Sequence, residues 1–278
     1  MAEKQVIHID LDQALEVLRK GVRRSDVFMG VGLNSSEHEP PISHLLAQDG
    51  QQQIHLVKQE LTGDEKTHVA KEFGKWIQTN GLRELLESFS TFMSALYSII
   101  FLIKQSQKQL DREFNKCRPE KFERMGIGAQ IERFSQVAPV SDGDVKVIRS
   151  LNKARNCYAH RHGLVAQADL DEGMVNLPVF WNALQFQIRE DNGNVVSGND
   201  IFGRVFSNGG KVQVAVREQS KDFGLGSELI FEKQELKEIC LCVLSIGERL
   251  FRETVSVAKS AGVLKEAVES NLDDPKPV

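Results

Sequence analysis

The apolar stretch FMSALYSIIFLI, residues 92–103, decides how the rest of the chain is read. A helix that spans a membrane needs about 20 apolar residues, and this stretch is shorter. We therefore interpret it as the buried part of a long helix that begins after Gly81 and ends near Cys117, before Pro119. The apolar positions that recur at helical spacing are Leu82, Leu85, Phe89, Met93, Leu96, Ile100, Ile103, Leu110 and Phe114.

Helical patterns also flank this segment. Residues 64–81 start with acidic side chains and end on Asn80–Gly81, a pair that is typical of a helix C-terminus. A shorter helix is predicted over about 119–136, with weak points at Gly126 and Gly128. The sequence APVSDGDVKV, residues 138–147, is expected to form a turn that caps the next helix.

The periodicity changes after Gly163. The sequence FWNALQFQIRED alternates apolar and polar residues and ends at Asn192–Gly193, as a strand does. Two further alternating runs are joined by Asn208–Gly209–Gly210, which is a strong hairpin signal. We predict a β-rich insert over about 174–231, after which a helical pattern returns over 231–260. Because helical blocks flank the insert, they are expected to pack together as one domain.

These patterns predict a mainly α fold: a helical bundle with a small β-hairpin-rich insert and an N-terminal extension. The extension covers residues 1–62, where a short helix over 10–24 precedes a loop from about 30 to 50. The bundle covers 63–265, and the polar, acidic segment 266–278 is expected to be a disordered tail. No apolar leader is visible at the N-terminus, which favours a cytoplasmic protein.

The composition excludes several classes of function. The formal net charge is −4, so any surface for nucleic acid must be a local basic patch. The four cysteines, Cys117, Cys157, Cys240 and Cys242, lack the spacing of a zinc site and are expected to be free thiols. The sequence has no phosphate-binding glycine loop, zinc-protease motif, serine-hydrolase motif or dinucleotide fingerprint. We expect neither a metal nor an organic cofactor.

One segment, ARNCYAHRHG at 154–163, carries more polar chemistry than a core helix requires. Arg155 falls within the apolar face of the helical wheel, where a guanidinium costs several kcal/mol unless it is paired. In the simplest interpretation Arg155 extends to the edge of this face or pairs with a neighbouring helix, and His160 is a surface residue. The core stripe on the wheel is Val147, Ile148, Leu151, Ala154 and Tyr158, and the opposite face holds Arg149, Lys153, Asn156 and His160.

The spacing of Arg155 and His160 resembles the R-x(4–6)-H motif of the HEPN superfamily. In that motif Asn, Asp or His commonly follows the arginine, as Asn156 does here. A long apolar helix precedes the motif, a glycine follows it, and another amphipathic helix completes the pattern. The resemblance covers about residues 64–165 and 230–260, and it implies a HEPN-like all-α bundle with the motif at the end of a late helix.

In catalytic members of the superfamily the motif is a metal-independent ribonuclease site. The resemblance thus implies that Arg155, Asn156 and His160 cleave RNA through attack by the ribose 2′-OH. A histidine exchanges protons near neutral pH, an arginine stabilises a pentacoordinate phosphorane, and an asparagine orients the pair. His162 is an auxiliary candidate for proton transfer, with a capping or surface role as the alternative. One subgroup carries at that position a tyrosine that accepts adenylyl groups, and this chain departs from it.

Contacts to RNA are expected from Arg149, Lys153 and Arg161, together with the lysines and arginines of segment 104–124. The alternative for these cations is an ordinary solvated helix face. A toxin or phage-defence role is implied by the resemblance, with an antitoxin or another defence-system protein as a partner, and no membrane.

Positions 155 and 160 lie about 140° apart around a straight helix, so one helix does not point both side chains at the same phosphate. Either the helix loosens near His160, or two copies of the motif meet to form a composite site. The usual dimer of the superfamily implies the second. Two alternatives remain: a catalytically silent HEPN domain that binds RNA, nucleotide or a protein partner, and a purely structural helical module.

Overall fold

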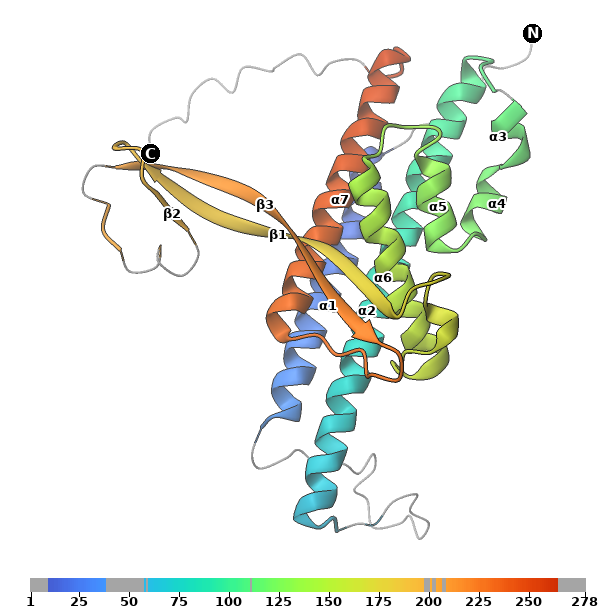
Figure 1. Ribbon diagram of the computed structural model, residues 1–278. Helices are drawn as coiled ribbons and strands as arrows, with labels where there is room; N and C mark the ends of the chain where they lie inside the picture. The colour runs from blue at the N-terminus through green and yellow to red at the C-terminus, as the bar shows by residue number, and fades with distance from the viewer. Residues whose placement is uncertain are drawn as a thin grey trace, which may run out of the picture.

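The computed structural model describes residues 10–38, 58, 60–110, 112–197, 201, 204–206 and 209–264. Within these residues the chain forms an elongated helical bundle from which a β arm projects to one side (Figure 1). The expectation of a mainly α fold with a small β element is confirmed at this level. The predicted tail, 266–278, lies outside the described residues.

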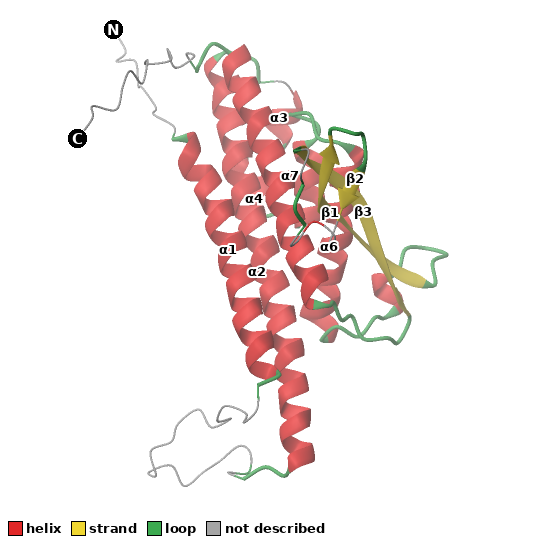
Figure 2. Ribbon diagram, turned by 90° about the vertical axis from the view of Figure 1, so that its left-hand side faces the viewer, coloured by secondary structure: helices red, strands yellow, loops and turns green. Residues whose placement is uncertain are grey.

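Three long helices form the body of the bundle and run side by side (Figure 2): α1 (Leu11–Ser36), α2 (Gly63–Ser106) and α7 (Lys233–Ser260). The apolar stretch that opened the sequence lies in α2, where Phe92, Leu96 and Ile100 are fully buried. Helix α2 is long and apolar enough to cross a membrane by length and composition, but 56% of its most apolar window is buried inside the bundle. The interpretation of this stretch as a core helix is compatible with that burial.

The predicted N-terminal extension contributes its helix to the core of the bundle. Helix α1 continues to Ser36, so the loop predicted from about residue 30 is wrong over its first part. Asp10 caps the helix by accepting hydrogen bonds from the backbone N–H groups of residues 12 and 13. Leu18 and Met29 belong to the same hydrophobic cluster as the residues of α2 and α7. The helical part of the segment before residue 63 is therefore packed into the bundle rather than appended to it.

The break predicted at Asn80–Gly81 is also wrong, because α2 passes through it without interruption. Gly81 faces α1, and a Cβ atom there would lie 2.2 Å from Met29 Cγ. The glycine therefore allows two helices to approach closely instead of ending one of them. Helix α2 stops at Ser106, earlier than predicted, and a separate short helix, α3 (Arg112–Lys116), follows.

The segment predicted as a single helix over 119–136 forms two short helices. These are α4 (Pro119–Glu123) and α5 (Ile127–Phe134), and Gly126 is the N-cap of the second. The weak point predicted at Gly126 is confirmed. Both helices pack against α2 on the side that faces α6 (Asp142–Arg161).

The β arm is a three-stranded antiparallel sheet in the order β2-β1-β3. Strand β1 (Asn176–Glu190) pairs along its whole length with β3 (Gly210–Gly224), and the short β2 (Val195–Ser197) pairs with the end of β1. The hairpin predicted across 208–210 does not form as expected, since β3 pairs with β1 and the described residues 204–206 are not in a strand. A 3₁₀ turn, η1 (Gln167–Asp169), connects α6 to the arm.

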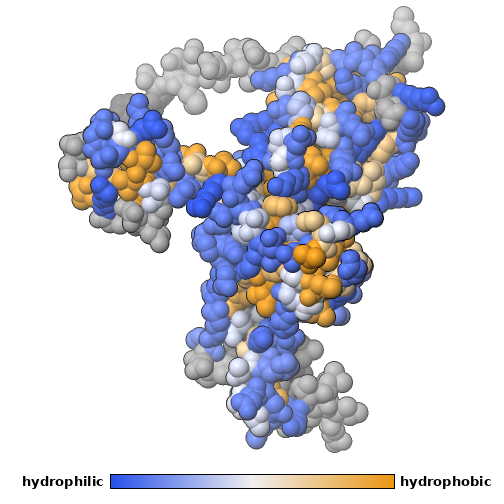
Figure 3. Space-filling view, viewed as in Figure 1, coloured by the Kyte–Doolittle hydropathy of each residue, from blue (hydrophilic) through white to orange (hydrophobic). Residues whose placement is uncertain are grey.

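The arm has a buried half and an exposed half. Near the bundle Val179 and Trp181 are buried, and the Trp181 indole N–H donates to Glu238 of α7 at 2.9 Å. Farther out, Phe186 is 59% exposed and the paired Val214 is 54% exposed, which gives the arm an apolar surface (Figure 3).

Candidate functional site

Helix α6 carries the candidate motif and is fixed at both ends. At the start, Ser141 Oγ accepts a hydrogen bond from the backbone N–H of Asp144 at 3.1 Å. The carboxylate of Asp144 forms an ion pair with Arg249 of α7 at 2.6 Å. The predicted cap and the predicted core stripe of α6 are both confirmed; the stripe consists of Val147, Ile148, Leu151, Ala154 and Tyr158, all buried.

The end of α6 is shaped by two residues of positive φ. His162 has φ 52° and is the C-cap, and its backbone N–H bonds to the carbonyl of Cys157. Gly163 follows with φ 82°, a conformation that favours glycine. The hydroxyl of Tyr158 donates to the carbonyl of Leu229, and burial raises the pKa of Tyr158 far above its usual range. Tyr158 thus ties the motif helix to the segment that leads into α7.

Arg155 extends from α6 to α2. Its Nη2 forms an ion pair with Glu87 Oε1 at 3.2 Å, and its Nη1 donates to Asn156 Oδ1 at 3.2 Å. Its side chain is 26% exposed, and its Nε is buried with no hydrogen-bond partner among the described residues. The ion pair with a neighbouring helix, weighed as the simplest interpretation of Arg155, is therefore present.

Glu87 is shared between two arginines. Arg83, one turn earlier in α2, donates from Nε to the same oxygen of Glu87 at 2.7 Å. Burial alone would raise the pKa of Glu87, but the hydrogen bonds and charges of Arg83 and Arg155 outweigh it and lower that pKa. The carboxylate is consequently ionised at neutral pH and holds Arg155 in place.

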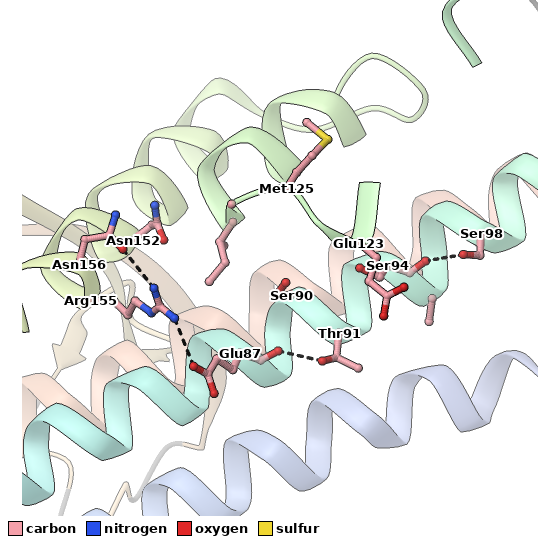
Figure 4. A pocket seen from close by; sticks show the side chains of 13 residues that line it. Glu87, Ser90, Thr91, Ser94, Ser98, Glu123, Met125, Asn152, Arg155 and Asn156 are labelled. Atoms are coloured by element: carbon pink, nitrogen blue, oxygen red, sulfur yellow. Dashed lines mark hydrogen bonds and ion pairs between the residues drawn. The ribbon is translucent and has the colours of Figure 1, made fainter. Parts of the chain in front are cut away.

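Arg155 and Asn156 line a cavity of about 630 Å³ between α2, the α4–α5 turn and α6 (Figure 4). The floor of the cavity is a row of hydroxyl groups on one face of α2. Thr91 Oγ1 and Ser98 Oγ each donate to the backbone carbonyl one turn before them. The hydroxyls are those of Ser90, Thr91, Ser94 and Ser98.

The wall of the cavity is fixed by Gln130 of α5, which is fully buried. Gln130 Oε1 accepts from Ser90 Oγ at 2.6 Å, and Nε2 donates to Ser94 Oγ at 3.2 Å and to the carbonyl of Phe122 at 3.1 Å. A buried amide that makes three hydrogen bonds in this way makes a surface rigid. The cavity is therefore built by specific bonds between α2, α4 and α5.

Sequence reasoning missed Glu87 and this row of hydroxyls. A signal for them exists in ESFSTFMSALYS, residues 87–98, where Glu87, Ser90, Ser94 and Ser98 recur at helical spacing opposite the apolar stripe. Gln130 gives no comparable signal, because its role depends on contacts with another helix.

His160 stands apart from the cavity. It is exposed near the end of α6, and among the described residues its side chain has no hydrogen bond or ion pair. The side chain of His162 is exposed as well. Within one chain, the structure thus brings Arg155 and Asn156 together at the cavity but does not bring His160 to them.

The three cations predicted to contact RNA are each paired with a carboxylate. Arg149 lies 2.8 Å from Glu132, and Lys153 pairs with Asp171. Arg161 Nε donates to the buried Asp169 at 2.7 Å, and this bond raises the pKa of Arg161. These pairs give the exposed side of α6 alternating charges in place of a continuous basic surface.

No group of three or more His, Cys, Asp or Glu side chains suited to a metal ion occurs among the described residues. All four cysteines are free and buried. Comparisons with known proteins give no match: no family model, no curated protein and no solved structure resembles the chain at a significant level.

Proposed function

We propose that this chain is a HEPN-type, metal-independent endoribonuclease that works as a homodimer in the cytoplasm, as a toxin or a phage-defence effector. The observation that carries the proposal is the position of Arg155 and Asn156 at a polar cavity of about 630 Å³. An arginine is well suited to a phosphodiester because its planar donors match two phosphate oxygens. The buried, unpartnered Nε of Arg155 leaves one such donor unsatisfied.

The second arginine on Glu87 supports this role. When a phosphate takes the guanidinium of Arg155, Arg83 stays on the same carboxylate at 2.7 Å. Glu87 is thus not left as an uncompensated charge when RNA binds. The arrangement lets Arg155 move from a carboxylate to a phosphate at a smaller electrostatic cost than an isolated ion pair would allow.

The chemistry requires a proton-transfer group near the phosphate. His160 takes the proton of the ribose 2′-OH, and the freed oxygen attacks phosphorus. Arg155 stabilises the pentacoordinate phosphorane, and the departing 5′-oxygen receives the proton from the imidazolium of His160, which returns to its neutral form. The products are a 2′,3′-cyclic phosphate and a 5′-hydroxyl. Because His160 lies outside the cavity in its own chain, the proposal places the His160 of a second copy at this phosphate.

A catalytically silent HEPN domain is the second candidate. Two other observations favour it: the side chain of His160 has no partner among the described residues, and Arg155 is held by Glu87. Such a domain would use the cavity to bind RNA, a nucleotide or a protein segment without cleaving it.

Cleavage of a mixed RNA pool tests the proposal. The parent chain should cleave RNA in the presence of EDTA and yield cyclic-phosphate ends, because no step uses a metal. His160→Ala should lower the rate by roughly 10²–10⁴. His68→Ala is the matched control, since His68 is also an exposed helical histidine but lies near the start of α2.

If His160→Ala cleaved RNA as fast as the parent, His160 would not be the proton-transfer group and the proposed site would be wrong. RNA binding without any cleavage by the parent would favour the silent domain. Activity that is lost with EDTA and restored by a divalent ion would mean a different reaction class.

A further inference from the structure

The cavity beside Arg155 has two ends with different chemistry. Arg155, Asn156 and Glu87 lie at one end, and Glu123, the last residue of α4, and Met125, in the α4–α5 turn, lie toward the other (Figure 4). Along α2 the lining runs from position 87 to position 98, which is about 16 Å of helix. A bound molecule that fills this length therefore meets a cation at one end and a carboxylate at the other.

The two carboxylates of the cavity are not equivalent. Glu87 is already held by Arg83 and Arg155. Glu123 is exposed and lines the cavity, and no described residue forms a side-chain hydrogen bond or ion pair with its carboxylate. An ionised carboxylate only accepts hydrogen bonds. The carboxylate of Glu123 is thus open to accept hydrogen bonds from a molecule in the cavity.

Between the two ends the cavity is partly polar and partly apolar. Ser94 Oγ accepts a bond from Gln130, which fixes the oxygen and leaves the hydroxyl hydrogen able to donate to a bound molecule. Asn152 adds an amide on the opposite side, from α6. Ile127 and Met125 add apolar surface near Glu123. Hydroxyl and amide groups suit a sugar, whereas apolar side chains suit the flat face of a nucleobase.

We propose that the cavity selects guanosine, with the nucleotide's phosphate on Arg155 and the base's Watson–Crick edge on Glu123. Guanine presents two adjacent donors on that edge, N1–H and N2–H, which match the two oxygens of a carboxylate. Adenine and cytosine present an amino group beside a ring nitrogen that repels a carboxylate, and uracil presents one N–H between two carbonyls. The assignment of a nucleotide as the ligand rests on the proposed ribonuclease function, and the preference for guanine rests on Glu123.

Calorimetric binding of nucleoside 3′-monophosphates to the full chain tests this inference. Guanosine 3′-monophosphate should bind about tenfold or more tightly than the adenosine, cytidine and uridine forms. Glu123→Gln should remove this preference and leave the melting temperature unchanged, because the side chain is exposed. Glu120→Gln is the matched control: Glu120 is an exposed glutamate of the same helix that does not line the cavity.

Arg155→Ala should weaken all four nucleotides by a similar factor, since it removes the phosphate contact and not the base contact. Binding of all four with equal affinity would overturn the inference, as would a guanosine preference that survives Glu123→Gln, or no binding of any of them.

The two proposals fail separately. Cleavage of RNA with no preference for guanosine would keep the ribonuclease and discard the guanosine site. Binding of guanosine 3′-monophosphate that depends on Glu123, in a chain that cleaves no RNA, would keep the site and discard the ribonuclease.

Discussion

At the scale of single residues, Arg155 shows how one side chain serves both packing and chemistry. It is half-buried at the contact of α2 and α6, and its charge is balanced by Glu87. Removing it should therefore affect stability less than activity. We expect Arg155→Ala to cost about 0–1 kcal/mol of unfolding free energy, because the partner carboxylate is 47% exposed and screened by water.

Arg155→Lys should not restore RNA cleavage, because a lysine keeps the charge but loses the planar pair of donors. Thermal melts and cleavage rates of Arg155→Ala and Arg155→Lys, measured side by side, check both expectations. A lysine variant with the activity of the parent would show that charge alone is sufficient and that two-point binding of phosphate is not used.

The buried thiols predict how the stability of the fold changes with pH. Burial, with Asp169 adding to it, raises the pKa of Cys157 to about 11. Burial also raises the pKa of Cys242 to about 11 and of Cys240 to about 12. The unfolded thiols ionise near their ordinary pKa of 9.0, so the unfolded chain binds fewer protons than the folded chain above that pH. The stability that these thiols give is complete below pH 9 and is lost as the pH rises toward 11 for Cys157 and Cys242 and toward 12 for Cys240.

Urea unfolding between about pH 8 and 10.5 measures this effect, because that range spans the ordinary thiol pKa. The parent should lose free energy of unfolding over that range, and a variant with alanine at positions 157, 240 and 242 should lose less of it. The folded parent should also leave a thiol reagent unconsumed near pH 8 and react at all four cysteines in denaturant. A fall of equal size in the two proteins would contradict the assignment to the thiols.

Part of this arrangement of single residues could be predicted from the sequence. A helical wheel found the buried stripe of α6 and placed Arg155 within its apolar face, because both follow from local periodicity. It did not find Glu87, since 68 positions separate it from Arg155 and the pair exists only after α2 and α6 pack. The placement of His160 away from the cavity agrees with the angle that helical geometry gives between positions 155 and 160.

At the scale of elements, a glycine explains why the break predicted at residues 80–81 is wrong. A glycine after a helical pattern signals either a helix end or a close approach to another helix, and local sequence does not separate the two. Gly81 belongs to the second kind and Gly163 to the first. The β1–β3 pairing was missed for a similar reason, because strong turn residues at 208–210 outweighed the longer-range pairing in the sequence pattern.

A substitution at Gly247 of α7 tests how α1 packs against α7. A Cβ there would lie 2.1 Å from Leu18 Cδ2 and 3.3 Å from Phe92, and both side chains are fully buried. Gly247→Ala should destabilise the chain by about 1–3 kcal/mol through overpacking. The roughly 1 kcal/mol that alanine gains over glycine in a helix offsets part of this cost, and the 2.1 Å approach to Leu18 places the overpacking toward the upper end of the range, so a net loss remains.

Gly30→Ala is the control for this substitution. Gly30 lies inside α1, and a Cβ atom added there would meet no described atom within 4 Å, so alanine should stabilise the helix by roughly 0.5–1 kcal/mol. Urea denaturation of the two variants and the parent measures both signs. Equal stability of Gly247→Ala and the parent would mean that α1 does not pack on α7 as described.

At the scale of the whole molecule, the positions of Arg155 and His160 on α6 determine how many chains a catalytic site requires. Arg155 and Asn156 face the cavity against α2, while His160 is exposed near the helix end. The helix is regular from Asp142 to Arg161, so it does not loosen to bring His160 round. Of the two solutions that the sequence left open, a composite site between two copies is therefore the one that the proposed ribonuclease needs.

Mixing two inactive variants tests this composite site. If Arg155 of one chain works with His160 of its partner, a mixed dimer of Arg155→Ala and His160→Ala has one site with both residues intact and one with neither. Equal mixing yields mixed dimers as about half of all dimers, so activity should return to about a quarter of the parent level. Each variant alone should stay inactive. Sedimentation at micromolar concentration should show a dimer for the parent and the mixture. A dimeric mixture that stays inactive, beside an active parent, would place Arg155 and His160 of a single chain at the same phosphate and end the composite arrangement.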